Sequence, residues 1–182
     1  MNAQNRKSMN APKSATAILF AMACSACTSQ PPLATVDHVD VDRFMGDWYV
    51  IANIPTYIET QAYNAVESYS LDPDGTIDTV FTFRKGGFDG EAKRYNPRGF
   101  ILNGETNAEW GMQFVWPIKA DYRIIYLDED YQVTVIGRNK RDYVWVMARE
   151  PSLSEKRYDS ILRMIEAAGY DLSKIRKVPQ QW

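Results

Sequence analysis

The stretch Phe44-Met45-Gly46-Asp47-Trp48-Tyr49-Val50-Ile51 decides the fold of this chain. Gly46 permits a tight backbone turn, because a residue without a Cβ reaches conformations that other residues avoid. Trp48 then places a large, stiff ring at the start of a run of residues that favour β-strands. Taken alone, this pattern indicates a strand that opens with a tryptophan buried in a core.

Two later segments give the opening stretch a more specific meaning. Asp121-Tyr122 begins the apolar run 122–126, and Arg149 ends the apolar run that starts at residue 143. A Gly-x-Trp near the start, an Asp-Tyr in the middle and a late strand ending in arginine resemble the three signature segments of the lipocalins. Ala120 is a minor departure, because the middle motif often has threonine there.

The resemblance extends over nearly the whole chain, from residue 41 to residue 178. The segments 64–71, 127–131, 141–145 and 169–174 are similar to those of bacterial lipocalins and of the related apolipoprotein D branch. No single motif is decisive, but their order and spacing together are specific.

Short strands separated by turn residues follow from Val41 onward, a pattern typical of an all-β sandwich or barrel. We expect strands at 48–54, 66–71, 76–84, 93–103 with a kink at 96–99, 111–116, 122–127, 132–137 and 143–149. About eight antiparallel strands close a barrel that holds one small ligand. The resemblance implies the same all-β fold, an eight-stranded antiparallel up-and-down lipocalin β-barrel.

The chain after the barrel predicts one helix. An apolar stripe with helical spacing is formed by Tyr158, Ile161, Leu162, Ile165 and Ala168. We expect this C-terminal α-helix to pack on the outer wall of the barrel. A short last strand is expected at 172–178.

Residues 1–26 have the composition of an export signal of the lipoprotein type. Three basic residues precede the apolar stretch 15–23. Met9 is an alternative first residue of the protein. The residues around Cys24 and Cys27 resemble a bacterial lipobox, whose cysteine is diacylated after cleavage. We favour lipidation of Cys27, because Ser25-Ala26 fits the two positions before it, with Cys24 as the alternative.

This N-terminal segment predicts where the protein resides. Ser29, the second residue after Cys27, favours the outer membrane over the inner one, with the domain facing the periplasm. Two acyl chains suffice for stable anchoring. Residues 27–40 then form a lipidated N-terminus and tether, and residues 41–182 form the barrel domain. The competing interpretation is a plain signal peptide cut after a small residue.

The composition excludes several classes of function. The formal net charge is −2, and without residues 1–26 it becomes −5. A domain with this acidic charge is a poor candidate for binding nucleic acid. His38 is the only histidine and lies in the expected tether, so neither a metal site nor histidine-based catalysis is indicated. The acidic run 128–130 lacks the spacing of a calcium loop and predicts a solvated hairpin. No cofactor is expected.

Five residues are expected to be structural: Gly46, Trp48, Asp121, Tyr122 and Arg149. In the family, the tryptophan of the first motif and the arginine of the third meet at the closed end of the barrel, so the resemblance implies a contact between Trp48 and Arg149. A guanidinium over an indole gains roughly 0.5–2 kcal/mol. Its other donors can bond carbonyl groups near residues 43–46, whereas Asp121 is expected to make a turn or loop contact.

The ligand-binding residues are then predicted from the two-residue period of the strands, with Trp48 and Arg149 facing inward. Phe81 and Phe83 share one face of their strand with Ile77 and Thr79. The predicted interior consists of Val50, Phe81, Phe83, Phe114, Trp116, Tyr122, Ile124, Tyr126, Tyr143, Trp145 and Met147. Each of these residues could instead fill the barrel as core, and a single bulge would invert a face.

An interior of this kind suits a small hydrophobic ligand. The resemblance implies binding, storage or transport of a fatty acid, phospholipid or lysophospholipid in the bacterial cell envelope. The alternatives are a carrier of a pigment, sterol or tetrapyrrole, an envelope barrel with a filled interior, and a lipid-modifying enzyme. Catalysis is not expected, because the acidic residues fall mostly on turns and outer faces.

Overall fold

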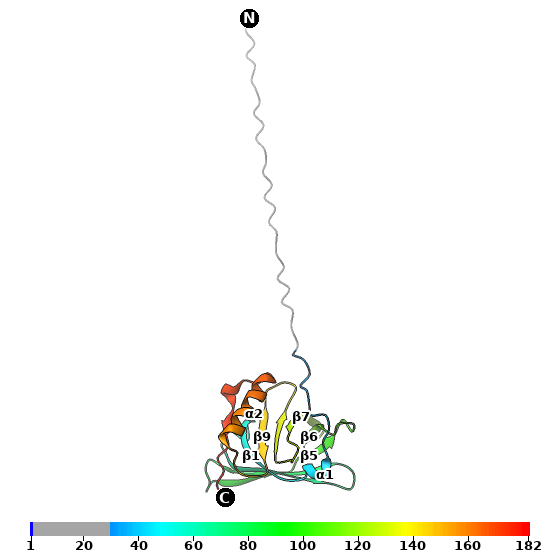
Figure 1. The fold of residues 1–182 in the computed structure, drawn as a ribbon, viewed down its shortest axis with the longest axis vertical. Coiled ribbons are helices and arrows are strands. Elements are labelled where there is room, and N and C mark those ends of the chain that lie inside the picture. The colour runs from blue at the N-terminus through cyan, green and yellow to red at the C-terminus, as the bar shows by residue number, and fades with distance from the viewer. Residues whose placement is uncertain (2–29) are drawn as a thin grey trace. The chain divides into compact units, whose positions relative to one another are not determined.

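The sheet of this protein closes on itself, because its first long strand pairs with its last one. The computed structural model describes Met1 and residues 30–182, of which 32–182 form one compact unit. The predicted export signal, Cys24 and Cys27 lie outside the described residues, so they stay predictions. Figure 1 shows the strands and the single long helix of the compact unit.

The elements follow the order that the sequence predicts. They are α1 (Val41–Phe44), β1 (Gly46–Ile54), β2 (Ala62–Leu71), β3 (Ile77–Lys85), β4 (Glu91–Tyr95), β5 (Arg98–Ile101), β6 (Glu109–Val115), β7 (Ile118–Leu127), β8 (Val133–Gly137), β9 (Val144–Ala148), α2 (Glu155–Ala167), the 3₁₀ helix η1 (Leu172–Lys174) and β10 (Arg176–Lys177). Neighbouring strands pair antiparallel, and β1 also pairs with β9, which closes the barrel.

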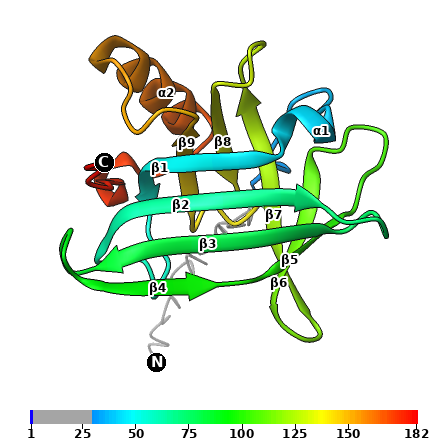
Figure 2. The ribbon, with the colours of Figure 1, turned by 90° about the horizontal axis from the view of Figure 1, so that it is seen from below.

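Within residues 32–182 the barrel has eight strands. β4 and β5 both pair with β3 and are two halves of one strand, interrupted at residues 96–97 where the sequence predicts a kink. β10 pairs only with the outer part of β1. Figure 2 shows β1 to β4 side by side, with α2 outside the sheet beside β8 and β9. The predicted eight-stranded lipocalin-type barrel is confirmed.

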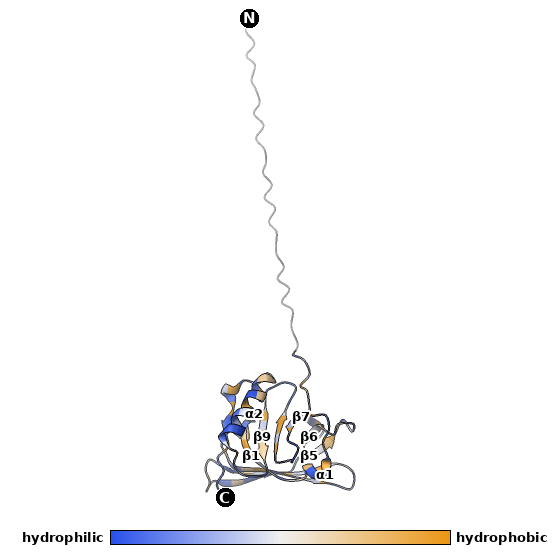
Figure 3. Ribbon diagram, viewed as in Figure 1, coloured by the Kyte–Doolittle hydropathy of each residue, from blue (hydrophilic) through white to orange (hydrophobic). Residues whose placement is uncertain are grey.

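Two apolar clusters hold the domain together, one on each side of the barrel wall. The inner cluster contains Phe44, Trp48 and Trp110, which are fully buried. The outer cluster joins β8 and β9 to Ile161 and Ile165 of α2. Burial of these two surfaces stabilises the fold at roughly 25 cal/mol per Å² of apolar area. In Figure 3 the strands behind α2 are largely hydrophobic, whereas the helix carries many hydrophilic residues.

The C-terminal helix lies outside the barrel as expected, but the segment after it differs from the expectation. Residues 172–178 form η1 and a two-residue strand instead of one continuous strand. The Asp171 side chain accepts a hydrogen bond from the Ser173 backbone N–H at 3.0 Å. Such a local side-chain bond favours a turn over an extended strand.

Packing begins earlier in the chain than the expected start of the barrel at Val41. Leu33 and Val39 are buried, at 4% and 0% exposure. The Val36 and Val39 N–H groups donate to carbonyls of Ile124 and Thr106, at 3.0 and 2.8 Å. Residues 33–40 therefore lie against the barrel, and His38 among them is exposed.

Among the described residues, none of the helices combines the length and apolarity needed to cross a lipid bilayer.

Candidate functional site

The closed end of the barrel is built around a stack of Arg149 on Trp48. The guanidinium carbon of Arg149 lies 3.8 Å from the centre of the Trp48 ring, and the ring is fully buried. The Trp48 Nε1 group donates to the Phe44 carbonyl at 2.8 Å. The expected contact between the first and third motifs is confirmed, and it places both residues in the framework of the barrel.

The guanidinium of Arg149 also binds the backbone of the segment that enters β1. Its Nη2 donates to the carbonyls of Arg43, Phe44 and Met45 at 3.0, 3.1 and 2.8 Å. Its Nη1 donates to the Asp47 carbonyl at 2.7 Å. Partial burial lowers the pKa of Arg149 from its ordinary value. One planar group therefore fastens α1, β1 and β9 together.

Gly46 leaves room for this arginine. Its φ is +93°, and a Cβ at this position would lie 3.3 Å from Arg149 Nη1. A side chain would therefore meet both backbone strain and a close contact.

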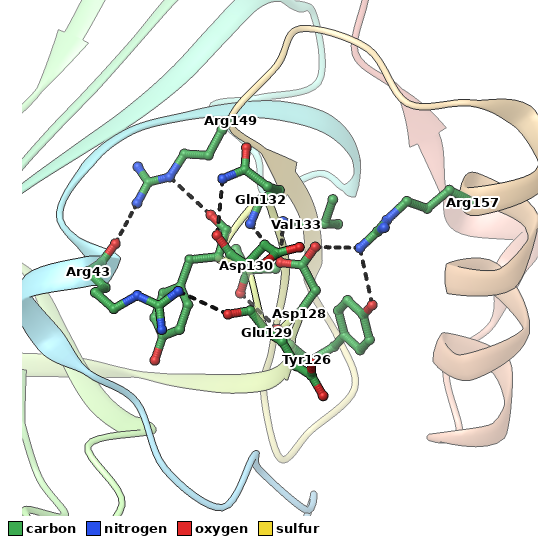
Figure 4. Close-up of polar contacts among 11 residues, drawn as sticks. Arg43, Tyr126, Asp128, Glu129, Asp130, Gln132, Val133, Arg149 and Arg157 are labelled. Atoms are coloured by element: carbon green, nitrogen blue, oxygen red, sulfur yellow. Dashed lines mark hydrogen bonds and ion pairs between the residues drawn. The ribbon is translucent and has the colours of Figure 1, made fainter.

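The turn between β7 and β8 completes the closed end (Figure 4). Asp128 Oδ1 accepts the backbone N–H groups of Gln132 and Val133 at 2.6 and 2.9 Å. Asp128 Oδ2 lies 2.5 Å from Nη2 of Arg157 in α2. The expectation of a solvated acidic hairpin is therefore wrong for Asp128, because tertiary packing brings the helix arginine to it.

A cavity lies at the opposite end of the barrel. Its lining comes from the β1–β2 connection, the β6–β7 hairpin, the β8–β9 connection and the inner faces of β2 and β3. About 610 Å³ is free of protein atoms there, including the part open to solvent.

Four of the predicted ligand-binding residues line this cavity: Phe81, Phe114, Tyr122 and Trp145. Ile58 and Met112 add further apolar surface. The ring of Trp145 is held by a hydrogen bond from Nε1 to Glu59 Oε1 at 2.8 Å. The walls of the cavity are thus mostly aromatic and aliphatic.

Four other predicted residues face the barrel interior without lining the cavity: Val50, Phe83, Ile124 and Met147. They belong to the inner apolar cluster and are at most 3% exposed. Val50, Ile124 and Met147 fill the barrel on the side of the closed end, whereas Phe83 lies beyond Phe81 toward the β1–β2 connection. The predicted inward face of β3, with Ile77, Thr79, Phe81 and Phe83, is confirmed by the burial of all four.

Tyr126 does not share the inner face with Tyr122 and Ile124, so that expectation is wrong. The pairing of β7 with β8 shifts register between Ile124 and Tyr126, and this bulge turns Tyr126 to the outer wall. Its hydroxyl lies 3.5 Å from Nη2 of Arg157. Tyr143 precedes β9, and it also packs with the outer cluster.

Trp116 lies at the tip of the β6–β7 hairpin and is 82% exposed. The expectation that it joins Phe114 in the interior is wrong, because β6 ends at Val115 and its pairing with β7 shifts register after Met112. Its neighbours Val115 and Ile118 are also exposed, at 68% and 69%. Figure 2 shows this hairpin projecting beyond the edge of the strands. The mouth of the cavity therefore has an exposed apolar hairpin beside it.

Sequence reasoning missed two acidic residues that line the cavity, Glu59 and Glu67. The expectation that acidic residues fall mostly on turns and outer faces does not hold for Glu67, which lies on the inner face of β2, whereas Glu59 does lie in a turn but is buried. Glu67 lies between Val66 and Ser68, so the two-residue period places it with Tyr69 on one face. That alternation is the signal that could have identified Glu67. Nothing comparable marks Glu59, which follows β1 in an irregular connection.

Glu59 is a structural carboxylate of the mouth. It is 5% exposed and accepts from the Thr56 hydroxyl and, at 3.0 Å, from the Thr56 N–H. Asn53 Nδ2 donates to it at 3.4 Å, in addition to the Trp145 bond. These contacts fix the β1–β2 connection over the cavity.

The floor of the cavity is polar. Tyr69 donates to Glu67, and its hydroxyl lies 2.8 Å from that of Tyr122. Burial raises the pKa of Glu67 to about 7, and the carboxylate of Glu59 adds to the shift. Burial, and then the charge of Glu67, raise the pKa values of both tyrosines well above normal. The Thr79 hydroxyl lines the cavity, is buried and has no hydrogen-bond partner.

Asp121 and Arg138 belong to the rim. Asp121 lies inside β7 rather than at the start of a strand, and it accepts from the Asn139 N–H at 2.7 Å. Its other oxygen lies 3.0 Å from Nε of Arg123. Asp121 therefore makes the expected loop contact, with the β8–β9 connection. Arg138 Nη1 lies 3.4 Å from Asp142.

In the part of the chain that the structure describes, no group of three or more histidine, cysteine, aspartate or glutamate side chains could hold a metal ion. The arrangement of the cavity can bind an apolar molecule along its walls and a hydrogen-bonding group at its floor.

Several known proteins are similar to this chain over most of its length. Temperature-induced lipocalin-1 of Arabidopsis thaliana is 30% identical over 84% of this chain and 86% of its own. The outer membrane lipoprotein Blc of Escherichia coli K12 is 27% identical over 91% of this chain and 93% of its own. Insecticyanin from the tobacco hornworm Manduca sexta superposes with a TM-score of 0.64 at 16% identity, over 81% of this chain and 84% of its own.

A family model described as a lipocalin-like domain matches residues 39–180. This range contains the closed barrel, the Trp48–Arg149 contact and the cavity. The chain belongs to the lipocalin family.

Proposed function

We propose that this protein binds a hydrophobic small molecule in the barrel cavity and stores or carries it in the bacterial cell envelope. Lipids are the preferred class: fatty acids, phospholipids or lysophospholipids. The observation that carries the proposal is the cavity itself, walled by Phe81, Phe114, Tyr122, Trp145 and Met112. Burial of an apolar chain there gains roughly 25 cal/mol per Å² of apolar area.

The proposed location is the periplasmic side of the outer membrane, through a lipid anchor on Cys27. The similarity to a protein named outer membrane lipoprotein Blc supports it. The lipobox-like residues 23–27 support it independently. An acyl anchor would keep the cavity within reach of a lipid surface.

The apolar hairpin beside the cavity supports a lipid ligand as well. Val115, Trp116 and Ile118 project their side chains into solvent, and exposed apolar clusters commonly mark interaction surfaces. Phe114 belongs to the same hairpin and lines the cavity. A lipid that leaves a membrane beside this hairpin would find apolar surface continuously up to the cavity.

A cavity-filling substitution tests the proposal. Ala120 lines the cavity, so Ala120→Trp should occupy it and abolish binding of palmitate and of a lysophospholipid. Ala92→Trp, on an exposed position of β4, is the matched control and should bind like the wild type. Native mass spectrometry of delipidated protein measures both. Failure of the wild type to bind either lipid would overturn the proposal, as would unchanged binding by Ala120→Trp.

A further inference from the structure

The deepest part of the cavity is polar, which a simple hydrocarbon tail does not match. Below a rim that carries Glu59, Asp121 and Arg138, the walls are apolar and include Phe81, Phe114 and Trp145. Its floor carries Glu67 and Thr79, together with the Tyr122 hydroxyl. A tail that reached the floor would exclude water from these groups. Glu67 and Tyr122 would keep their hydrogen bonds to Tyr69, but the Thr79 hydroxyl would have no partner. An unsatisfied buried polar group costs roughly 1–3 kcal/mol.

Thr79 is the sharpest sign of a missing partner. Its side chain is 1% exposed, and its hydroxyl makes no hydrogen bond within the described residues. Thr79 pairs with Tyr69 across β2 and β3, and Phe81 pairs with Glu67. Thr79 and Glu67 are therefore diagonal neighbours on the inner face of two adjacent strands, so one small polar group can reach both.

We propose that the floor of the cavity, formed by Thr79 and Glu67, is a subsite for the hydroxyl or carbonyl group of an otherwise apolar, neutral ligand. This inference rests on the proposed carriage of a hydrophobic small molecule, and within that class it favours neutral alcohols and carbonyl compounds over the charged lipids named above. The ligand enters with its polar group first. Its apolar body then lies along Phe81 and Trp145, and its far end reaches the hairpin of Phe114.

A hydroxyl group satisfies the floor in both directions. Thr79 can donate to the ligand oxygen, and the Glu67 carboxyl group can accept from a ligand hydroxyl or, when protonated, donate to it. Tyr69 already donates to one oxygen of Glu67, which holds the carboxyl group in place. A carbonyl group can accept from Thr79 and from protonated Glu67.

A carboxylate is disfavoured at the same place because the surrounding charge is acidic. Glu67 would meet it directly, and Glu59 and Asp121 also line the cavity. Arg138 is the only cationic residue among the described lining residues, and it belongs to the rim and not to the floor; its Nη1 pairs with Asp142 at 3.4 Å, whereas its buried Nε has no hydrogen-bond partner. Burial is the main cause of the raised pKa of Glu67, and the negative charge of Glu59 raises it further.

The titratable groups near Glu67 are those of Glu59, Tyr69, Tyr122, Asp121 and Arg138. Since both tyrosines have pKa values well above normal, Glu67 is the group that changes charge near neutral pH. Binding of a carboxylate should therefore weaken as the pH rises through about 7, whereas binding of an alcohol should change little.

The test compares dodecanol, dodecanoate and dodecane by titration calorimetry on wild type, Thr79→Val and Thr82→Val. Thr82 lies on the other face of β3, away from the cavity lining, and controls for loss of a threonine. Wild type should bind dodecanol about tenfold more tightly than dodecanoate, a difference of about 1.4 kcal/mol. Thr79→Val should weaken dodecanol about fivefold and strengthen dodecane, because it removes an unpaired hydroxyl. Thr82→Val should change neither.

The outcomes separate the two proposals. If wild type binds none of the three molecules, the carrier function itself fails and this inference fails with it. If all three bind and Thr79→Val alters dodecanol and dodecane alike, the polar subsite is wrong while the carrier function stands. Thr79→Ser keeps the hydroxyl and should keep the preference for dodecanol. This variant therefore separates the loss of the hydroxyl from a general effect of substitution at this position. Dodecanoate that binds as tightly as dodecanol above pH ~7 would also overturn the inference.

Discussion

The guanidinium of Arg149 lies 3.8 Å above the ring of Trp48 and so joins two strands that are about a hundred residues apart in sequence but adjacent in the closed barrel. The same guanidinium binds four backbone carbonyls of residues 43–47. This end of the molecule is framework, and the cavity at the other end is available for a ligand. The first prediction follows from that division.

Replacing Arg149 by lysine should destabilise the barrel and leave the choice of ligand unchanged. Lysine keeps the charge but cannot stack as a plane and donate to several carbonyls at once. We expect the free energy of unfolding to fall by about 2 kcal/mol, measured by urea denaturation. Arg163→Lys, at an exposed position of α2, is the control and should have no effect. Equal melting temperatures of wild type and Arg149→Lys would contradict the prediction.

Glu67→Gln should remove a pH dependence of stability. The folded protein holds the Glu67 proton up to about pH 7, whereas an ordinary glutamate loses it near 4.5. Between these values only the folded state binds this proton, so wild-type stability should decrease as the pH rises through this window. The raised pKa of Glu67 contributes about 3 kcal/mol in total to the free energy of unfolding, at roughly 1.4 kcal/mol per pKa unit.

The measurement is the difference between the unfolding free energies of wild type and Glu67→Gln at several pH values. Relative to wild type, the glutamine variant should become more stable as the pH rises from 4.5 to 7. Glu166→Gln, exposed on α2, is the control: its unfolding free energy should change with pH in the same way as that of the wild type. A parallel course for Glu67→Gln as well would show that Glu67 titrates normally.

Asp128 should be important for stability although it lies in an acidic turn. Asp128→Ala removes the ion pair with Arg157 and the two backbone bonds to residues 132 and 133. We expect a loss of about 2–3 kcal/mol in unfolding free energy, because the partly buried guanidinium loses its partner. Asp128→Asn should lose less, because its amide oxygen can still accept the backbone bonds. Asp130→Ala, at an exposed position in the same turn, should be neutral, and an equal loss in both alanine variants would refute this account.

The double substitution Trp116→Ser with Ile118→Ser should lower association with lipid vesicles without lowering stability. Both side chains are mostly exposed in the folded protein, so their removal costs little packing. Each apolar side chain that enters the interface contributes roughly 1–3 kcal/mol, so binding to phosphatidylglycerol vesicles should fall at least about tenfold. Leu102→Ser, 61% exposed in the β5–β6 connection, is the control. Unchanged vesicle sedimentation of the double variant would count against a lipid-facing hairpin.

The centre of the closed end was expected from the sequence, whereas the ion pair of Asp128 with Arg157 in the same region was not. Gly46, Trp48 and Arg149 occur in segments with specific spacing, and the contact between Trp48 and Arg149 was found as expected. The inner face of β3 was also correct, because an uninterrupted strand keeps its two-residue period. Local chemistry determines the inner face of β3, whereas the contact of Trp48 with Arg149 was implied by the resemblance to the lipocalins.

The cavity was predicted less well, and the errors have particular causes. Tyr126 faces outward because a bulge shifts the pairing of β7 after Ile124. Trp116 is exposed because β6 ends before it. Glu59 and Glu67 face inward although acidic residues usually stay in water. The position of Tyr126 depends on how neighbouring strands pair, and that of Glu59 on the path of the β1–β2 connection, neither of which a single strand reveals.

The sequence by itself determined that the chain forms an antiparallel barrel with an outer helix, since alternation and turn residues are local signals. The contact of Trp48 with Arg149 at the closed end was implied by the order and spacing of motifs that resemble those of the lipocalins. Only the tertiary structure decided which side chains line the hollow and that its floor is polar. The physical reason is that strand register and bulges are set by closure of the sheet, and a shift of one residue moves a side chain from one face to the other.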